Sequence, residues 1–283
     1  PIKNLDNANG HFIGLMKTQG NGSKLLLKFI EKQINERKKS LQLDPKLDLN
    51  KLRIVDVLQD LTISGEKIET ITYMLQGEFE HEDSTGAKGK MKSGDVQWMK
   101  TGSGIIHSEM PAMSEGKLHG FQLWVNMPAE LKMSKPDYIY IDSDKMQVHI
   151  DSDKQVKVIA GKFENAEGPI KGHNVEPIYF DIELEKDKDF NFELPSSHNS
   201  FIYLIDGEIK IGEKTHNKIK DSTLILLTKG EKLQVSALTK AKFLLISGKP
   251  IGEQIARGGP FVMNTKAEVL QAVQDYHNGT FVK

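Results

Sequence analysis

The feature that most constrains the fold is a succession of short strand-like segments that starts near residue 63. Segments such as "ETITYML", "GEFEHED", "GDVQWM", "FQLWVNM", "YIYID" and "MQVHI" are rich in Thr, Val, Ile and Tyr, and Gly, Pro, Asp or Ser separates them. β-Branched and aromatic residues favour pleated strands, and turn residues at this spacing are typical of antiparallel barrels or sandwiches. The sequence therefore predicts an all-β fold for most of the chain.

The strand pattern occurs twice. Tyr73 stands four residues before Gly77 in "TITYMLQGEFEHED", and Tyr203 stands four residues before Gly207 in "FIYLIDGEIKIGEK". The later segments "GDVQWMKTGSG" and "KDSTLILLTKG" also correspond. Such internal similarity indicates a duplicated barrel; the alternative is that two unrelated hairpins look alike. We predict a first barrel over 63–145 and a second over 146–283.

Helices are expected at the two ends of the chain. Residues 1–62 lack the strand pattern and contain two helical patterns, one after Ser23 and one after Asp48. Near the other end, "NTKAEVLQAVQDYHNG" has Asn264 or Thr265 as the N-cap and apolar residues on one face. We predict a partly helical N-terminal segment and a C-terminal helix that belongs to the second barrel.

Composition excludes several classes of protein. The 283 residues carry a formal net charge of −1, so a nucleic acid is not expected as a direct partner. The chain has no cysteine, which excludes disulfides and thiolate metal sites. Apolar runs are short and the first residues lack a signal pattern, so we expect no membrane span and a cytoplasmic location, or a nuclear one in a eukaryote. Phosphate-loop, dinucleotide-binding and "GxSxG" motifs are absent from the sequence.

The segment "GSGIIHSEMP" contains the clearest candidate site. Residues two apart in a strand point to the same face, so His107 and Glu109 are expected to face the barrel interior together. Imidazole and carboxylate are suitable ligands for a divalent first-row metal ion. The alternative is a hydrogen-bonded histidine–glutamate pair without a metal.

Further ligands should come from a neighbouring strand. Glu69 opens the strand that runs to Leu75 and is the candidate third ligand; the alternative is a carboxylate at a strand end, in water. His81 shares a face with Phe79 and Asp83 by alternation, and we expect it on the sheet surface.

The segment "IETITYMLQGEFEHEDSTGAKGKMKSGDVQWMKTGSGIIHSEMP" closely resembles the core of the pirin family, which belongs to the cupin superfamily. "LHGFQLWVNMP" and "GKPIGEQIARGGPFVMNTKAEVLQAVQDY" are also similar to pirin segments, so the resemblance covers residues 66–283. It implies a bicupin, in which two antiparallel β-barrels form an N-terminal cupin barrel and a C-terminal cupin barrel. Residues 1–62 do not match the family.

The resemblance also implies an iron-like site in the first barrel. Its family ligands are two histidines of an "HPHRGFET"-like string and a histidine and glutamate of a "GIxHxE" string. The second pair corresponds to His107 and Glu109, whereas Ile63 and Gly65 replace the first two histidines. Glu69 corresponds to the glutamate of the "GFET" string. We expect a weak site for Fe or another divalent first-row metal.

Two functions follow from the resemblance. The first is a metal-dependent quercetin 2,3-dioxygenase that takes a small aromatic, flavonol-like substrate, with Glu109 as ligand and candidate base. The second is a metal-free regulatory or binding protein that resembles a transcription cofactor. Its protein partner would bind the lysine-rich segment 24–39. Aligning "TKGEKLQVSA" with "TGSGIIHSE" leaves the second barrel without an equivalent of His107 and Glu109, so we expect that barrel to be structural.

Overall fold

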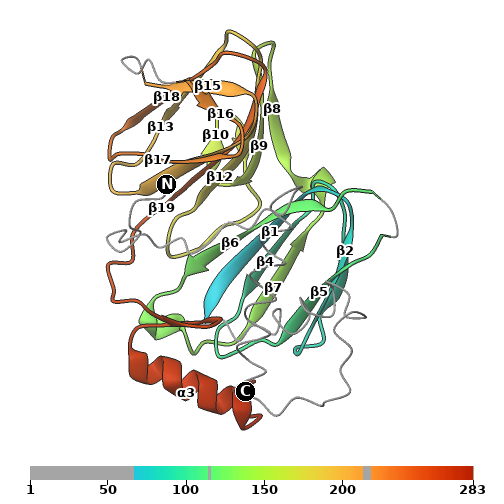
Figure 1. The fold of residues 1–283 in the computed structure, drawn as a ribbon, viewed down its shortest axis with the longest axis vertical. Coiled ribbons are helices and arrows are strands. Elements are labelled where there is room, and N and C mark those ends of the chain that lie inside the picture. Colours follow the sequence, from blue (N-terminus) through green and yellow to red (C-terminus); the bar gives the residue numbers. More distant parts are fainter. Residues whose placement is uncertain (1–66, 114–115, 213–217, 283) are drawn as a thin grey trace, which may run out of the picture. The chain divides into compact units, whose positions relative to one another are not determined.

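The computed structural model describes residues 67–113, 116–212 and 218–282 (Figure 1). These residues are mostly β-strand, with one α-helix, α3, near the C-terminal end. They divide into two compact units, the N-terminal unit (67–140 with 253–282) and the C-terminal unit (141–252). The predicted all-β character is thus confirmed, while the helices expected within 1–62 lie outside the described residues.

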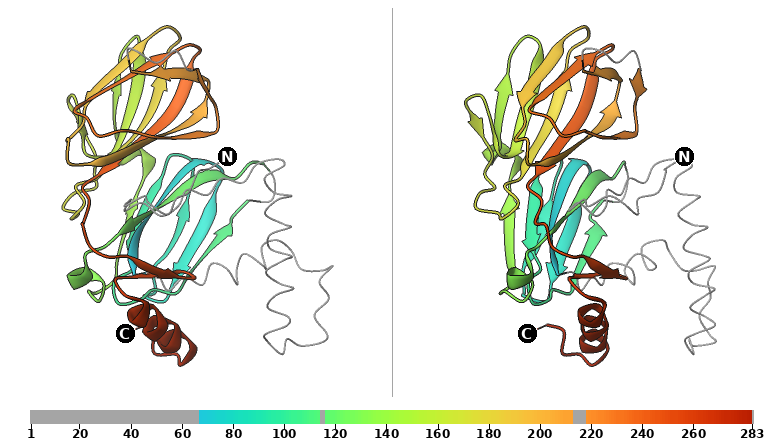
Figure 2. Two further views of the ribbon diagram at one scale, coloured as in Figure 1. Left: turned by 60° about the vertical axis from the view of Figure 1, so that its left-hand side comes forward. Right: turned by 90° about the vertical axis from the view of Figure 1, so that its left-hand side faces the viewer.

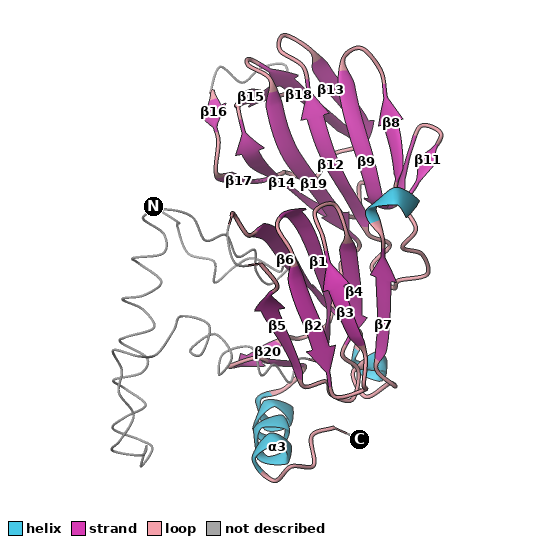
Figure 3. Ribbon diagram, turned by 90° about the vertical axis from the view of Figure 1, so that its right-hand side faces the viewer, coloured by secondary structure: helices cyan, strands magenta, loops and turns pink. Residues whose placement is uncertain are grey.

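The N-terminal unit contains two antiparallel sheets. The strand order of the first sheet is β6-β1-β4-β7, and that of the second is β3-β2-β5. The strands of the first sheet are β1 (Ile68–Gln76), β4 (Val96–Lys100), β6 (His119–Asn126) and β7 (Asp137–Ile141). The strands of the second sheet are β2 (Phe79–Asp83), β3 (Lys88–Met91) and β5 (His107–Pro111). Figure 3 shows β2 and β5 side by side.

A tight turn links the two sheets of this unit at Gly77, between β1 and β2. Gly77 has φ +94°, a backbone conformation that L-residues rarely adopt. A Cβ atom at this position would lie 2.8 Å from the carbonyl oxygen of Lys117. Glycine therefore allows both the turn and the close approach of the neighbouring chain.

The C-terminal unit is a second barrel (Figure 2), and buried apolar side chains fill its interior. A six-stranded sheet has the order β17-β14-β19-β12-β9-β8, and a four-stranded sheet has the order β13-β18-β15-β16. The strands of the larger sheet are β8 (Gln147–Ile150), β9 (Lys154–Ala160), β12 (Ile178–Leu184), β14 (Asn199–Asp206), β17 (Thr223–Leu226) and β19 (Ala241–Gly248). The other strands are β10 (Lys162–Phe163), β11 (Ala166–Glu167), β13 (Asp189–Glu193), β15 (Glu208–Ile211), β16 (Ile219–Lys220) and β18 (Lys232–Ala237).

The two units share one strand plan, as the sequence repeat predicted. β1 lies between β4 and β6, and β14 lies between β17 and β19. The turn glycines Gly77 and Gly207 have φ +94° and +89°. Within the described ranges, β6 has one strand neighbour, whereas its counterpart β19 has two.

The last segment of the chain packs on the N-terminal unit, which differs from the predicted boundary that assigned it to the second barrel. The Glu253 carboxylate accepts a hydrogen bond of 2.8 Å from the backbone N–H of Ala129. The Lys132 ammonium donates to the carbonyl of Val262 at 2.9 Å. Val262 belongs to β21 (Phe261–Met263), which pairs with β20 (Ala256–Gly258). By these contacts the segment groups with the N-terminal unit, whereas sequence order places it after the second barrel.

Helix α3 (Lys266–His277) begins and ends where the sequence predicted. The Thr265 hydroxyl accepts from the backbone N–H of Glu268, whose carboxylate accepts from the N–H of Thr265 in return, so the two residues form a capping box. Val269 and Ala272 are buried in one apolar cluster with Phe281. None of the helices in the described part of the chain is long and apolar enough to span a membrane.

Candidate polar site in the N-terminal barrel

His107 and Glu109 lie on β5 and face β2. In the antiparallel register, Glu109 is opposite His81 and His107 is opposite Asp83. His107 is 6% exposed, and the Glu109 side chain is 18% exposed. Because side chains alternate along each strand, these four residues share one face of the second sheet. They form the polar cluster described below.

Side chains from the facing sheet hold the Glu109 carboxylate. Gln97 on β4 donates to Glu109 Oε1 at 2.9 Å, and Gln122 on β6 donates to Oε2 at 3.2 Å. The Thr72 hydroxyl on β1 lies 3.4 Å from Oε1. Three strands of the first sheet therefore fix the carboxylate that β5 presents.

His81 is buried in the same cluster, so the prediction that it lies on the sheet surface is wrong. It is 1% exposed, and its Nε2 lies 3.1 Å from Asp83 Oδ2. Its ring stacks at 5.6 Å from that of His107 and at 4.9 Å from that of Tyr138. Alternation gave the correct set of residues sharing a face, but that face is the buried one. The apolar Phe79 on the same face was the signal that could have indicated this.

Asp83 orients His81 and also closes the turn after β2. Its Oδ1 accepts from the Thr85 backbone N–H at 2.8 Å, from the Thr85 hydroxyl at 2.6 Å and from the Ala87 N–H at 3.2 Å. Oδ2 remains directed at the His81 ring. A short Asx turn thus holds the carboxylate that selects the orientation of the imidazole.

The pKa values of the cluster diverge because charge and burial compete. Burial raises the pKa of Glu109, but the nearby imidazoles of His81 and His107 outweigh it and hold that pKa below its usual range. Burial opposes protonation of His81, yet the carboxylates of Glu109 and Asp83 raise its pKa overall. Burial lowers the pKa of His107. The site thus favours a charged carboxylate at Glu109 and a neutral imidazole at His107.

Glu69 does not join the cluster. Its position on β1 is three residues from Thr72, so its side chain lies on the opposite face of the sheet. It is 5% exposed and accepts a hydrogen bond of 2.8 Å from the Trp98 indole N–H. Glu69 is therefore neither beside His107, as a third ligand would be, nor in water at a strand end. Because side chains alternate along β1, its carboxylate points to the opposite face, where it makes a buried polar contact.

The predicted donor set does not fit a metal ion as it stands. No three His, Asp or Glu side chains among the described residues converge on one metal position. Ile63 and Gly65, which replace the family histidines, lie outside those residues. Both Glu109 oxygens accept hydrogen bonds from amides. The metal roles of His107 and Glu109 therefore stay predictions.

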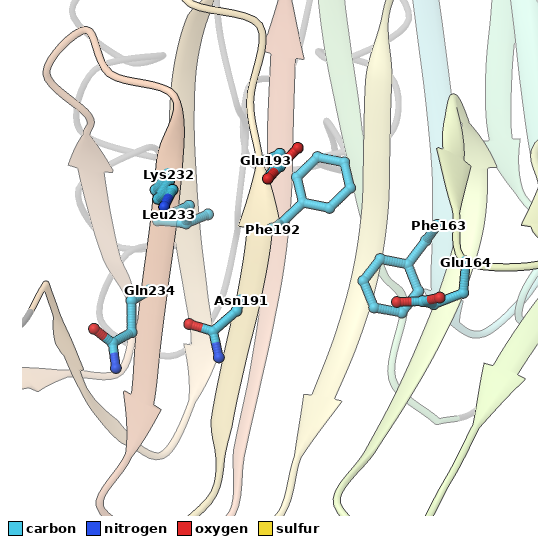
Figure 4. Close-up of a pocket in the computed structure, with 8 residues that line it drawn as sticks. All are labelled: Phe163, Glu164, Asn191, Phe192, Glu193, Lys232, Leu233 and Gln234. Atoms are coloured by element: carbon cyan, nitrogen blue, oxygen red, sulfur yellow. The ribbon is translucent and has the colours of Figure 1, made fainter.

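The C-terminal unit has an open surface pocket of about 530 Å³ (Figure 4). Its lining combines side chains of β13 and β18 with the β10 end, namely Phe163, Glu164, Asn191, Phe192, Glu193, Lys232, Leu233 and Gln234. The lining holds no histidine, and the barrel core around it is apolar.

Sequence comparisons identify relatives over most of the chain. Residues 59–125 match the Pirin family, and residues 179–282 match the Pirin C-terminal cupin domain. A "Pirin-like protein" of Caulobacter vibrioides is 40% identical over 215 residues, covering 75% of this chain and 77% of that protein. A protein of Vibrio cholerae named "Putative quercetin 2,3-dioxygenase" is 40% identical over 219 residues, covering 76% of this chain and 77% of that protein.

Solved structures show the same fold. The quercetin 2,3-dioxygenase of Acinetobacter baumannii matches with a TM-score of 0.71 and 33% identity, over 77% of this chain and 76% of that chain. The bacterial pirin YhhW of Escherichia coli, solved in complex with nickel(II), matches with a TM-score of 0.52 and 25% identity, over 65% of this chain and 73% of that chain. With its two cupin barrels, this chain belongs to the pirin family.

Proposed function

We propose that the N-terminal barrel binds a small planar phenol of the flavonol class at Glu109. The observation that carries the proposal is a partly exposed, negatively charged carboxylate that two amides hold inside a barrel. Relatives named as quercetin 2,3-dioxygenases make a flavonol the first ligand to test.

Glu109 would act mainly as a hydrogen-bond acceptor. An acidic phenolic O–H donates to one carboxylate oxygen, while Gln97 and Gln122 keep the carboxylate in place. Charge-assisted hydrogen bonds of this kind are stronger than neutral ones. In the proposed role of Glu109 as a base, the flavonol O–H bond breaks and a Glu109 O–H bond forms. The lowered pKa of Glu109 makes that transfer less favourable than binding alone.

A reaction of the flavonol with dioxygen requires groups that this cluster of side chains does not supply. A bound divalent metal would supply the electronic pathway between flavonol and dioxygen, but the described residues do not assemble a ligand set for it. We therefore assign to these residues the binding and orientation of the flavonol, and propose that 2,3-dioxygenase activity depends on an added metal ion. The same observation supports the second candidate, a metal-free binding protein with a regulatory role.

Binding and turnover of quercetin distinguish the two candidates. We expect quercetin to bind the metal-free protein, and Glu109→Ala to weaken binding by about 10–100-fold, the cost of one charge-assisted hydrogen bond. Glu69→Gln on the opposite face is the matched control and should bind normally. Wild-type protein that fails to bind quercetin would exclude the proposal.

Oxygen consumption tests the enzymatic part separately. Purified protein is assayed with quercetin before and after addition of Fe(II), Ni(II) or Mn(II), with elemental analysis of the starting material. Metal-dependent oxygen uptake supports a dioxygenase. Quercetin binding without oxygen uptake under any of these conditions favours the metal-free binding protein.

A further inference from the structure

We infer that the surface pocket of the C-terminal unit binds a small aromatic amine, with Glu164 as the main partner of its ammonium group. The pocket volume of about 530 Å³ is within the range of sites that hold small molecules. The inference concerns the C-terminal unit alone and does not depend on whether the N-terminal barrel binds a flavonol.

The pocket lies at an open edge of a sheet. β13 ends the four-stranded sheet, so among the described residues it has a single strand neighbour, β18. Side chains of β13 and β18 line one side of the pocket, and Phe163 and Glu164 at the end of β10 line the other (Figure 4). The barrel is therefore open here, and a ligand can reach aromatic side chains from solvent.

Aromatic rings form the floor of the pocket. The ring centroids of Phe163 and Phe192 are 6.0 Å apart, and Figure 4 shows the two rings directed toward each other. Phe163 is buried, whereas Phe192 is half-buried, so part of the Phe192 ring is accessible. Because aromatic rings attract one another in offset or edge-to-face contacts, this floor favours a ligand with a ring of its own.

The rim of the pocket carries more negative than positive charge. Glu164 and Glu193 are exposed there, and Lys232 lies opposite Glu193 in the β13–β18 register. Lys232 offsets the charge of Glu193, whereas Glu164 forms no ion pair within the described ranges. Glu164 is therefore the carboxylate available for a charge-assisted hydrogen bond from an ammonium group.

The backbone of Glu164 is strained. Glu164 is the first residue of the two-residue turn between β10 and β11, and its φ is +50°. Glycine is preferred at such an angle, because a side chain there crowds the backbone. Of the four non-glycine residues with positive φ in the described part of the chain, Glu164 is the one that lines the pocket. Strain at this position supports a role for the Glu164 side chain in binding.

Two carboxamides complete the lining. Asn191 and Gln234 lie opposite each other in the β13–β18 register, so their side chains share one face of the sheet. Each carboxamide both donates and accepts hydrogen bonds, which allows a polar substituent on the ligand ring. An anionic ligand would be repelled by the carboxylates at the rim, and an aromatic amine would not.

The test is calorimetric titration of the full chain with phenethylamine, which has a ring and an ammonium group but no phenolic O–H. We expect a dissociation constant on the order of 1 mM or below. Hydrocinnamate, in which a carboxylate replaces the ammonium group, and n-butylamine, which lacks the ring, should each bind at least about tenfold more weakly. Failure of phenethylamine to bind, or equal binding of the three compounds, would overturn the inference.

Two charge variants of the same hairpin locate the site. Glu164→Gln should weaken phenethylamine binding by about tenfold, because it removes the charge and keeps the size of the side chain. Glu167→Gln is the matched control, since Glu167 lies on β11 outside the pocket lining, 3.1 Å from the Lys171 ammonium. It should bind phenethylamine as wild type does. Wild-type affinity in Glu164→Gln would contradict the assignment.

Glu164→Gly separates binding from stability. Glycine relieves the strain of the turn, so Tm should rise by about 2–4 °C. Phenethylamine binding should nevertheless fall as it does in Glu164→Gln, an opposition that a purely structural residue would not show. Undiminished binding in Glu164→Gly, or a lower Tm, would count against the role of Glu164.

Discussion

His81 and Glu109 lie directly opposite each other on β2 and β5, with His81 Nδ1 3.9 Å from Glu109 Oε1. This pairing places an imidazole and a carboxylate inside the barrel, where the Gln97 amide from the facing sheet contacts both and the Gln122 amide contacts Glu109. A slip of one residue in the β2–β5 register would turn one of them outward, since side chains alternate between faces. The register is therefore the element on which the whole polar cluster depends.

Asp83 should contribute to stability through the turn that it closes. Asp83→Ala removes the acceptor of three donors and leaves His81 without its carboxylate, so we expect the free energy of unfolding to fall by about 2–3 kcal/mol. Asp83→Asn retains an acceptor oxygen and should lose less. Urea denaturation followed by fluorescence measures both. Equal losses would show that the charge at Asp83, and not the turn, is what matters.

Glu69 should matter for stability and not for metal or flavonol binding. Glu69→Ala leaves the buried Trp98 indole N–H without this acceptor, which costs about 1–3 kcal/mol. Glu69→Gln keeps an acceptor oxygen and should cost less. Thermal unfolding measures the difference, and the Trp98 emission should shift in the alanine variant. A large effect of Glu69→Gln on quercetin binding would contradict this placement.

Lys132 should make stability depend on alkaline pH. Lys132 is 1% exposed, and its ammonium donates to the carbonyls of Lys67 and Val262 and to Asn126 Oδ1. Burial lowers the pKa of Lys132 from 10.5 to about 8. Between these values the unfolded chain binds more protons than the folded one, so stability should rise with pH.

The expected size of the Lys132 effect is roughly 3 kcal/mol between pH 8 and 10.5, since each pKa unit corresponds to about 1.4 kcal/mol. Below pH 8, Lys132 is charged in both states and this dependence should vanish. Lys132→Met lacks the group and isolates its effect from those of other titrating residues. Between pH 8 and 10.5, the free energy of unfolding of wild type should rise relative to that of Lys132→Met, as measured by urea denaturation. If the free energies of unfolding of the two proteins changed in parallel with pH, the lowered pKa of Lys132 would be refuted.

Gly104 should be required for docking of the C-terminal segment. It has φ +141°, and an added Cβ would lie 2.5 Å from a ring carbon of Phe281 and 2.7 Å from its carbonyl oxygen. Gly104→Ala should therefore combine backbone strain with displacement of Phe281. The strain alone costs about 1–3 kcal/mol of the free energy of unfolding, and with the displacement the total loss should exceed about 2 kcal/mol.

Gly86 is the matched control for Gly104. It has φ +90°, but an added Cβ would meet no atom within 4 Å. Gly86→Ala should cost only the strain of its turn. Limited proteolysis of the region after residue 253, together with thermal unfolding, separates the two variants. If Gly104→Ala and Gly86→Ala were equally sensitive to proteolysis and to heat, Phe281 would be shown to move aside readily.

The sequence by itself determined the succession of strands along the chain, the repeat and the last helix, because these depend on local patterns. Alternation showed that His107 and Glu109 share a face, as do Phe79, His81 and Asp83. The N-cap was readable as Asn264 or Thr265 because capping is local, and the structure shows that it is Thr265.

Only the tertiary structure decided which face is buried and which distant residues meet there. Alternation is a relation within one strand, so it could not show that β2 turns His81 inward or that β1 turns Glu69 away from the cluster. Gln97 and Gln122 carried no signal, because an amide acquires its role from the carboxylate that it meets across the barrel. The packing of residues 253–282 on the N-terminal unit could not be read from the sequence for the same reason, since its contacts join residues more than a hundred positions apart.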